Sequence, residues 1–171
     1  PVYNEEVMIC EAIDGLVREL GETLPDLEYE ILITENGSSD RTVELARELE
    51  SRYPQVKALN SPEPNYGRAL RRAILEAKGT FVLCDEIDIC DVDFQRRALQ
   101  ILTADDADMV IGSKAHSDAD DRRPLVRRTA TLVLNGLLRV LLGFGGTDTH
   151  GLKAFRRETL LPVVSRCIVD K

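Results

Sequence analysis

The chain has 171 residues, of which 43% are hydrophobic, and this size and composition suit one globular domain rather than two. Its formal net charge of -8 argues against a protein that wraps nucleic acid non-specifically. Its four cysteines include no CxxC pair, which argues against a zinc finger or a disulfide framework and favours a reducing, cytoplasmic location.

Both ends of the chain read as interrupted elements. Residues 1–6 resemble the end of a strand that runs into a helix, and no closing signal precedes Lys171. We therefore expect residues 1–171 to form a single domain that lacks most of its first strand and a C-terminal portion. The sequence contains no signal peptide and no apolar run of membrane-spanning length.

The first helix is predicted to follow Asn4, a good N-cap, with Glu5 and Glu6 in its first turn. Apolar residues then recur at helical spacing, at Ile9, Ile13, Leu16, Val17 and Leu20. Later segments alternate between short apolar runs and amphipathic stretches. They predict strands over residues 29–34, 56–60, 80–84 and 108–112, helices over 41–53 and 93–102, and a helix that follows the loop 61–67 and runs through Ala77.

This alternation of strands and helices predicts an α/β fold with a mainly parallel sheet flanked by helices. In such sheets, ligands bind beyond the carboxyl ends of the strands. Polar or acidic segments fall at three of these ends, over residues 4–6, 35–40 and 85–93. The sequence therefore predicts a binding site at this edge of the sheet.

The pattern changes after Gly112. Residues 113–121 are polar, and 122–142 form a helix candidate that carries arginines beside an apolar stripe. Such a helix suits an anionic membrane surface or a lipid phosphate, and it equally suits a core helix with one solvated face. A loop over 143–151 and a short final strand over 152–156 complete the expected elements.

Two polar segments each allow two interpretations. The acids of residues 85–93 (Asp85, Glu86, Asp88, Asp91 and Asp93) repel one another unless they are solvated or bridged by a cation. They fit either an Mg²⁺ or Mn²⁺ site or an acidic loop that caps the next helix. The loop 35–40 fits either hydrogen bonding to a ribose or base, or a well-capped turn between a strand and a helix.

Taken together, the ordered motifs resemble the family 2 glycosyltransferases of the GT-A fold. The closest likeness is to the branch that transfers sugars to polyprenyl phosphates such as dolichol phosphate. The resemblance runs from Pro1 to about Arg157 and rests on the segments 1–6, 35–42, 65–70, 112–114 and 148–155. It implies a GT-A, Rossmann-like catalytic domain.

The resemblance also implies roles for individual residues. Those matching nucleotide-sugar contacts are Pro1, Tyr3, Glu5, Glu35, Asn36, Gly67, Arg68 and Asp85, with Glu35 and Asn36 replacing two aspartates of the family's loop. Glu86 and Asp88 stand where the family has its Asp-x-Asp metal motif, which implies Mg²⁺ or Mn²⁺.

For the acceptor side, Asp148 and Lys153 match catalytic positions. Arg122, Arg123, Arg127 and Arg128 would face an acceptor phosphate or the membrane.

The reaction implied is the transfer, with inversion, of a sugar from a UDP- or GDP-sugar to a polyprenyl phosphate, at the inner face of a membrane. Two alternatives stay open at this point. One is a soluble transferase that uses a small polar acceptor. The other is a non-catalytic module that binds a nucleotide sugar, because the loop 35–40 and the metal motif both depart from the family pattern.

Overall fold

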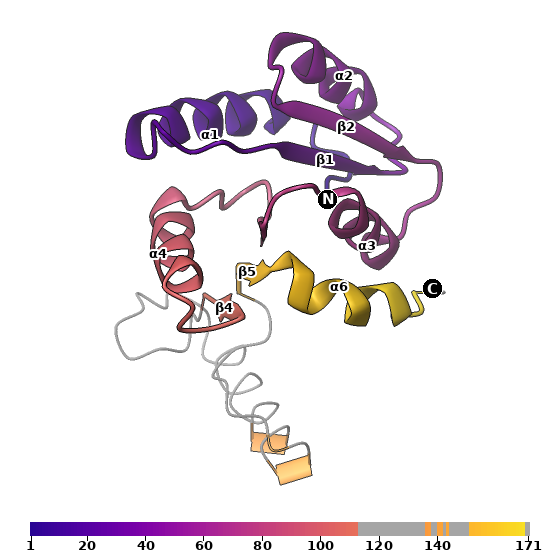
Figure 1. Ribbon diagram of the computed structural model, residues 1–171. Coiled ribbons are helices and arrows are strands. Elements are labelled where there is room, and N and C mark those ends of the chain that lie inside the picture. Colours follow the sequence, from indigo (N-terminus) through magenta and orange to yellow (C-terminus); the bar gives the residue numbers. More distant parts are fainter. Residues whose placement is uncertain (113–135, 138–139, 142, 144–150, 170–171) are drawn as a thin grey trace.

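The computed structural model describes residues 1–112, 136–137, 140–141, 143 and 151–169 (Figure 1). Helices and strands alternate along the first 112 residues, which confirms the α/β class. The elements are α1 (Ile9–Thr23), β1 (Ile31–Asn36), α2 (Thr42–Arg52), β2 (Val56–Ser61), α3 (Tyr66–Glu76), β3 (Phe81–Cys84), α4 (Val92–Thr103), β4 (Met109–Ile111), β5 (Lys153–Arg156) and α6 (Arg157–Arg166).

The first sheet consists of β1 and β2, which are parallel and pair from Ile31 opposite Val56 to Asn36 opposite Ser61. Helices α1 and α2 lie on one side of this sheet and α3 lies on the other (Figure 1). The apolar stripe of α1 is buried as predicted, and it packs with α2 and the two strands. This core cluster comprises Val2, Ile9, Ile13, Ile33, Ala46, Leu49 and Val56.

The second sheet has the order β3-β5-β4, and β5 is antiparallel to both of its neighbours. Because β5 runs in the opposite direction, its first residue, Lys153, lies opposite the last residue of β3, Cys84. Helix α4 packs against this sheet through Phe94, Ala98 and Leu102. The antiparallel strand therefore brings the segment around Lys153 to the carboxyl end of β3.

Two helices begin with side-chain caps. The carboxamide oxygen of Asn65 accepts a hydrogen bond from the Arg68 N–H, and Asp91 accepts one from the Phe94 N–H, both at 2.9 Å. Each cap satisfies a backbone donor that has no partner inside its helix.

Helix α6 was not predicted from the sequence, and Pro162 lies inside it. The guanidinium of Arg71 on α3 donates hydrogen bonds to the carbonyls of Val164 and Ser165, at 3.0 and 2.8 Å. This tertiary contact offsets the poor helix propensity of proline.

The prediction for the first helix was wrong at its start. The helix begins at Ile9, and Met8 occupies the N-cap position without a side-chain hydrogen bond. Asn4 instead adopts a left-handed conformation with φ of 54°, and its carboxamide oxygen accepts the Ser39 N–H. Asparagine reaches this region more easily than most residues, because its short polar side chain bonds to nearby backbone.

The remaining boundaries differ from the predicted ones by one or two residues. The largest consequence is at β1, which lies two residues later than predicted and so includes Glu35 and Asn36. Most of the predicted helix 122–142 lies outside the described residues, of which 136–137 and 140–141 are helical. In the described part of the chain, no helix is both long enough and apolar enough to cross a membrane.

Candidate active site

Polar side chains from three elements meet at the carboxyl ends of β1 and β3. We name the residues Glu35, Asn36, Asn65, Asp85 and Glu86 the strand-end cluster. The Asn36 carboxamide oxygen accepts a hydrogen bond from the Asn65 N–H, which ties the end of β1 to the start of α3. Pro1 lies beside the end of β3, close to Asp85 and Glu86.

Glu35 is a buried carboxylate at the end of β1, with 2% of its surface exposed. Its Oε1 atom accepts the N–H of Ser38, which tightens the turn after the strand. Its Oε2 atom is buried and has no hydrogen-bond partner among the described residues. A buried carboxylate oxygen without a donor is costly, so this atom is available to a hydroxyl or N–H group of a ligand.

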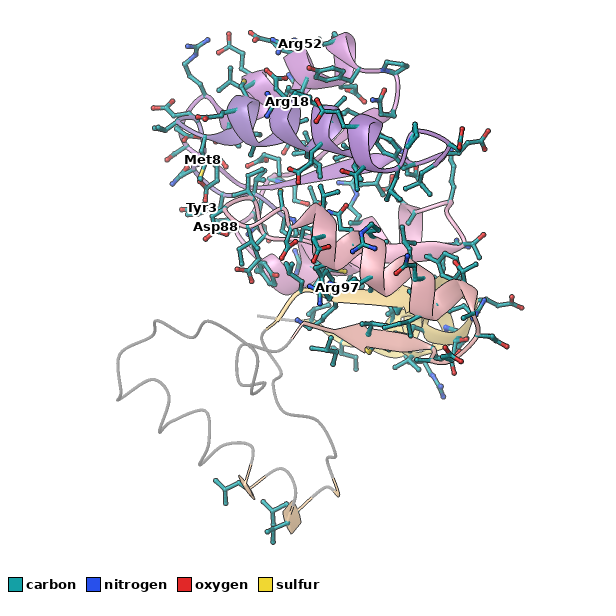
Figure 2. The ribbon with its side chains drawn as sticks, turned by 90° about the vertical axis from the view of Figure 1, so that its left-hand side faces the viewer. Tyr3, Met8, Arg18, Arg52, Asp88 and Arg97 are labelled. Atoms are coloured by element: carbon teal, nitrogen blue, oxygen red, sulfur yellow. The ribbon has the colours of Figure 1, made fainter. Side chains whose placement is uncertain are left out.

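The first six residues are held against the turn after β1 by backbone-to-side-chain hydrogen bonds. The N–H groups of Asn4 and Glu5 donate to Ser38 Oγ and Thr42 Oγ1, at 2.9 and 2.8 Å. Tyr3 directly precedes these two residues in the sequence and is 47% exposed. Figure 2 shows the predicted site residues Tyr3 and Asp88 on the same side of the molecule.

Asp85 directly follows β3 and is largely buried beside α4. Its Oδ2 atom accepts a hydrogen bond from the Gln95 side chain, whereas its Oδ1 atom is buried without a partner among the described residues. Burial raises the pKa of Asp85 to about 6, although the hydrogen bond from Gln95 opposes the shift.

The acidic segment 85–93 divides between the two interpretations that its sequence allowed. Asp91 caps α4, and Asp93 forms ion pairs with Arg96 and Arg97 at 2.8 and 2.9 Å, as expected of a helix-capping loop. Glu86 and Asp88 are exposed. Asp91 and Asp93 therefore stabilise α4, whereas Glu86 and Asp88 remain available to solvent or a ligand.

The predicted metal residues offer few donors. Among residues 1–112 and the other described segments, no group of three or more His, Cys, Asp or Glu side chains converges as metal ligands. Mg²⁺ is commonly held by one or two carboxylates together with substrate phosphates. The exposed, hard oxygen donors of Glu86 and Asp88 fit a cation that is bound jointly with a diphosphate.

Gly67 and Arg68, predicted to contact the nucleotide sugar, lie in the first turn of α3. A Cβ atom on Gly67 would come within 2.6 Å of Val169 Cγ1, so Gly67 packs against the C-terminal segment. The Arg68 guanidinium is half exposed and pairs with Glu63 at 3.2 Å. Arg68 is the member of this pair whose side chain can turn toward a phosphate.

Lys153 lies next to the strand-end cluster, because β5 pairs with β3. Its Nζ atom donates a hydrogen bond to the Gly151 carbonyl at 2.8 Å. Gly151 itself has no room for a side chain, since a Cβ atom there would overlap the Gly112 carbonyl oxygen. The close approach of these two glycine backbones fixes the start of β5 and hence the position of the lysine.

The other predicted acceptor residues (Asp148, Arg122, Arg123, Arg127 and Arg128) lie outside the described residues. Sequence reasoning missed Thr42, Asn65 and Gln95, which position parts of the site through the contacts above. Asn65 carried a signal, since an asparagine just before a helix is a good N-cap. Thr42 lies in the motif segment 35–42, but its contact with Glu5, 37 positions away, could not be inferred from the sequence. Gln95 carried no signal, because its partner Asp85 is 10 positions away.

Comparison with known proteins identifies a matching family and several similar proteins. A family model described as glycosyl transferase family 2 matches residues 1–161. A dolichyl-phosphate beta-glucosyltransferase of Trichomonas vaginalis is 32% identical to this chain, over 93% of it and 52% of the relative. A dolichyl-phosphate beta-glucosyltransferase of Dictyostelium discoideum is 30% identical, over 93% of this chain and 53% of the relative.

Among solved structures, the crystal structure of a mycobacterial protein resembles this chain with a TM-score of 0.59 and 24% sequence identity. The match covers 94% of this chain and 52% of that chain, and it supports the α/β fold. This chain spans about half the length of the curated relatives above.

Proposed function

This chain belongs to glycosyl transferase family 2, and from that membership we propose that the protein containing it transfers a sugar from a nucleoside-diphosphate sugar to a polyprenyl phosphate. The observation that carries the proposal is the strand-end cluster, where β1, β3 and the start of α3 bring buried and exposed carboxylates to one edge. The two relatives above, both dolichyl-phosphate beta-glucosyltransferases, support the choice of a lipid-phosphate acceptor.

For the donor, we assign Glu35 and Asn36 to the ribose or base. The Oε2 atom of Glu35 is a buried acceptor without a protein partner in the described part of the chain. Asn36 already uses its oxygen for Asn65, which leaves its amide N–H groups for a carbonyl of the base. Pro1, Tyr3, Glu5, Gly67, Arg68 and Asp85 complete the proposed donor site.

For the diphosphate, we assign Glu86 and Asp88 as the residues that hold Mg²⁺ or Mn²⁺. When bound, such a cation neutralises charge on the departing nucleoside diphosphate. The exposure of both carboxylates suits this role, because the cation and the diphosphate then enter and leave together.

For the acceptor, we assign Lys153 to a phosphate, since its ammonium group lies beside the end of β3. A lipid phosphate is already ionised at neutral pH and attacks the anomeric carbon with little help from a base, inverting its configuration. A hydroxyl acceptor would need a base, and Asp148 is the candidate. Arg122, Arg123, Arg127 and Arg128 are assigned to the acceptor phosphate or the inner face of the membrane.

The test is calorimetric titration of the full-length protein with UDP and with GDP, each with and without Mn²⁺. We expect Mn²⁺-dependent binding of one nucleotide, which Asp88→Asn weakens by roughly tenfold or more. The matched control is Asp93→Asn, five positions further on, whose ion pairs with Arg96 and Arg97 lie outside the proposed site. Failure of both nucleotides to bind under every condition would contradict the proposed donor site.

A transfer assay then separates the candidate acceptors. The same protein is incubated with the preferred donor and either dolichyl phosphate or small sugar alcohols, and the labelled products are extracted into organic or aqueous phases. Transfer to dolichyl phosphate supports the proposal, and transfer only to the small alcohols replaces it with a soluble transferase. Nucleotide binding with no transfer or donor hydrolysis would instead leave a non-catalytic nucleotide-sugar-binding module.

A further inference from the structure

Several polar residues of the segments 1–6 and 35–42 have no role in the proposed donor site. In the structure they bind one another, and so join the chain ahead of α1 to the turn after β1. We name residues 4–6 and 38–42 the clasp. Its hydrogen bonds link positions that are 34 to 37 residues apart in the sequence, so they are tertiary contacts rather than local turns.

Three backbone donors of the first segment bind side chains of the second. The N–H groups of residues 4–6 lie ahead of α1 and have no acceptor within that helix. In chain order they donate to Ser38 Oγ, Thr42 Oγ1 and Asp40 Oδ2, at 2.9, 2.8 and 3.1 Å. The second carboxylate oxygen of Asp40 accepts the Thr42 N–H at 2.9 Å, which fixes the orientation of this acid.

Two backbone donors of the second segment bind side chains of the first. The N–H groups of Ser39 and Arg41 lie ahead of α2, and they donate to Asn4 Oδ1 and Glu6 Oε2 at 2.9 and 3.0 Å. Asn4 makes this contact from the left-handed conformation, with φ of 54°. A residue other than glycine stays in this region only where the surrounding contacts determine its backbone, so the clasp holds Asn4 there.

The clasp lies between two parts of the proposed donor site. Tyr3 directly precedes it in the first segment, and Glu35 and Asn36 lie at the end of β1, just ahead of the second. The Ser38 N–H also donates to Glu35 Oε1, so a clasp residue touches the donor-site carboxylate itself. Groups that bind one ligand together must keep their relative positions to within about 0.5 Å.

The fold depends little on the clasp. The core cluster already packs α1 against both strands of the first sheet. Three clasp residues, Asn4, Glu6 and Ser39, are exposed, and hydrogen bonds that compete with water add little to global stability. What the clasp supplies is the relative position of the two segments.

We propose that Asn4 and Thr42 are positioning residues, which hold Tyr3 in register with Glu35 so that both meet the nucleoside of the donor. This inference rests on the proposed function. Both side chains act through their neighbours, because Thr42 is buried and Asn4 Oδ1 is already bonded to Ser39. Loss of either contact is expected to weaken donor binding and to leave the chemical step unchanged once the donor is bound.

Thr42 offers a matched pair of variants, tested in the full-length protein. Thr42→Val replaces the hydroxyl by a methyl group, whereas Thr42→Ser keeps the acceptor of the Glu5 N–H. We expect Thr42→Val to raise the Kd of the preferred nucleotide, UDP or GDP, and the KM of its sugar conjugate by roughly tenfold, with kcat within about twofold of the parent. Thr42→Ser should stay within about threefold of the parent in both constants.

The outcomes separate this inference from the proposed function. If the parent protein binds neither nucleotide, the proposed function fails and this inference fails with it. If the parent binds a nucleotide and Thr42→Val binds it equally well, the inference alone is overturned. A fall in kcat with an unchanged KM would also overturn it, because Thr42 would then act in the chemical step.

Asn4 provides a second test at an exposed position. Asn4→Gly accommodates the left-handed backbone but removes the acceptor of the Ser39 N–H, whereas Asn4→Asp keeps an acceptor. We expect Asn4→Gly to raise the nucleotide Kd by roughly fivefold and Asn4→Asp to restore most of the binding. Amide hydrogen exchange should be faster at Ser39 in Asn4→Gly and unchanged at Ala12, whose N–H bonds to Met8 at the start of α1. Faster exchange at Ser39 with an unchanged Kd would overturn the proposal, since the clasp would then be structural only.

Discussion

The acidic side chains at the strand ends and those on the outer helices differ in how their carboxylate oxygens are paired. Glu35 and Asp85 each carry a buried oxygen with no partner in the described part of the chain. Glu44, Glu76 and Asp93 each form an ion pair with an arginine three or four positions away on the same helix or at its start. The difference indicates that the outer acids stabilise their own helices, whereas each strand-end acid keeps one oxygen without a partner in the described part of the chain.

The largest expected effect on stability comes from replacing a glycine by alanine, which should act in opposite directions in the two regions. Gly37 follows β1 with φ of 74°, and a Cβ atom there would lie 2.7 Å from Pro64 N. Gly37→Ala combines backbone strain with a clash against backbone and is expected to lower the free energy of unfolding by about 3 to 4 kcal/mol. Urea denaturation followed by circular dichroism measures the change.

Gly15→Ala is the matched control on the outer helices. Gly15 lies inside α1, and a Cβ atom there meets no atom within 4 Å. Alanine is the better helix former, so this variant is expected to gain about 0.5 to 1 kcal/mol. Destabilisation of similar size in both variants would mean that the tight contact between the β1 turn and the α3 loop is absent in solution.

The next prediction concerns the carboxylates themselves. Glu35→Ala removes the acceptor of the Ser38 N–H and leaves a cavity at a buried position, with an expected loss of about 2 to 3 kcal/mol. Glu44→Ala removes an exposed acid that pairs with Arg41, and its unfolding curve should overlay that of the parent protein. A Glu35→Ala protein as stable as Glu44→Ala would show that Glu35 is solvated rather than buried.

The order of elements could be predicted because it depends on local patterns. The apolar spacing of α1, α3 and α4 is a local signal, and these helices formed as expected apart from the start of α1. The placement of β5 between β3 and β4 could not be predicted, because its pairing partners are at least 42 positions distant, the separation of Lys153 and Ile111. Long-range pairing depends on packing that no local segment encodes.

The location of the candidate site was also predictable in part. The rule that ligand loops follow parallel strands indicated the ends of β1 and β3, and the structure brings these ends together through Asn36, Asn65 and Pro1. The contact of Gln95 with Asp85 was not predictable, since nothing in a helix sequence marks a glutamine as buried. The roles assigned to individual site residues stay predictions.

A smaller effect separates two acids of the same segment. Asp91 caps α4, and its side chain accepts the Phe94 N–H, so Asp91→Ala is expected to lower the free energy of unfolding by about 1 kcal/mol. Asp93→Ala breaks only exposed ion pairs with Arg96 and Arg97 and should be indistinguishable from the parent protein. Thermal denaturation of the two variants measures the difference in their stability. If Asp93→Ala were the less stable variant, Asp91 would not be the residue that caps α4.

The smallest expected effect is a dependence on pH at an outer acid. Hydrogen bonds from Arg72 and Lys57 lower the pKa of Glu76 below its ordinary value of 4.5. A lowered carboxyl pKa stabilises the folded protein above about pH 4.5, and this contribution is lost as the pH falls through the folded-state pKa. Because the side chain is 32% exposed, solvent screening limits the contribution to about 0.5 kcal/mol. Glu76→Gln should therefore be slightly less stable than the parent in urea denaturation at pH 7, and the two curves should converge at about pH 3. A difference in stability that is the same at pH 3 as at pH 7 would mean that the substitution acts through packing rather than through charge. The ion pairs of the outer acids would then not distinguish them from the strand-end acids.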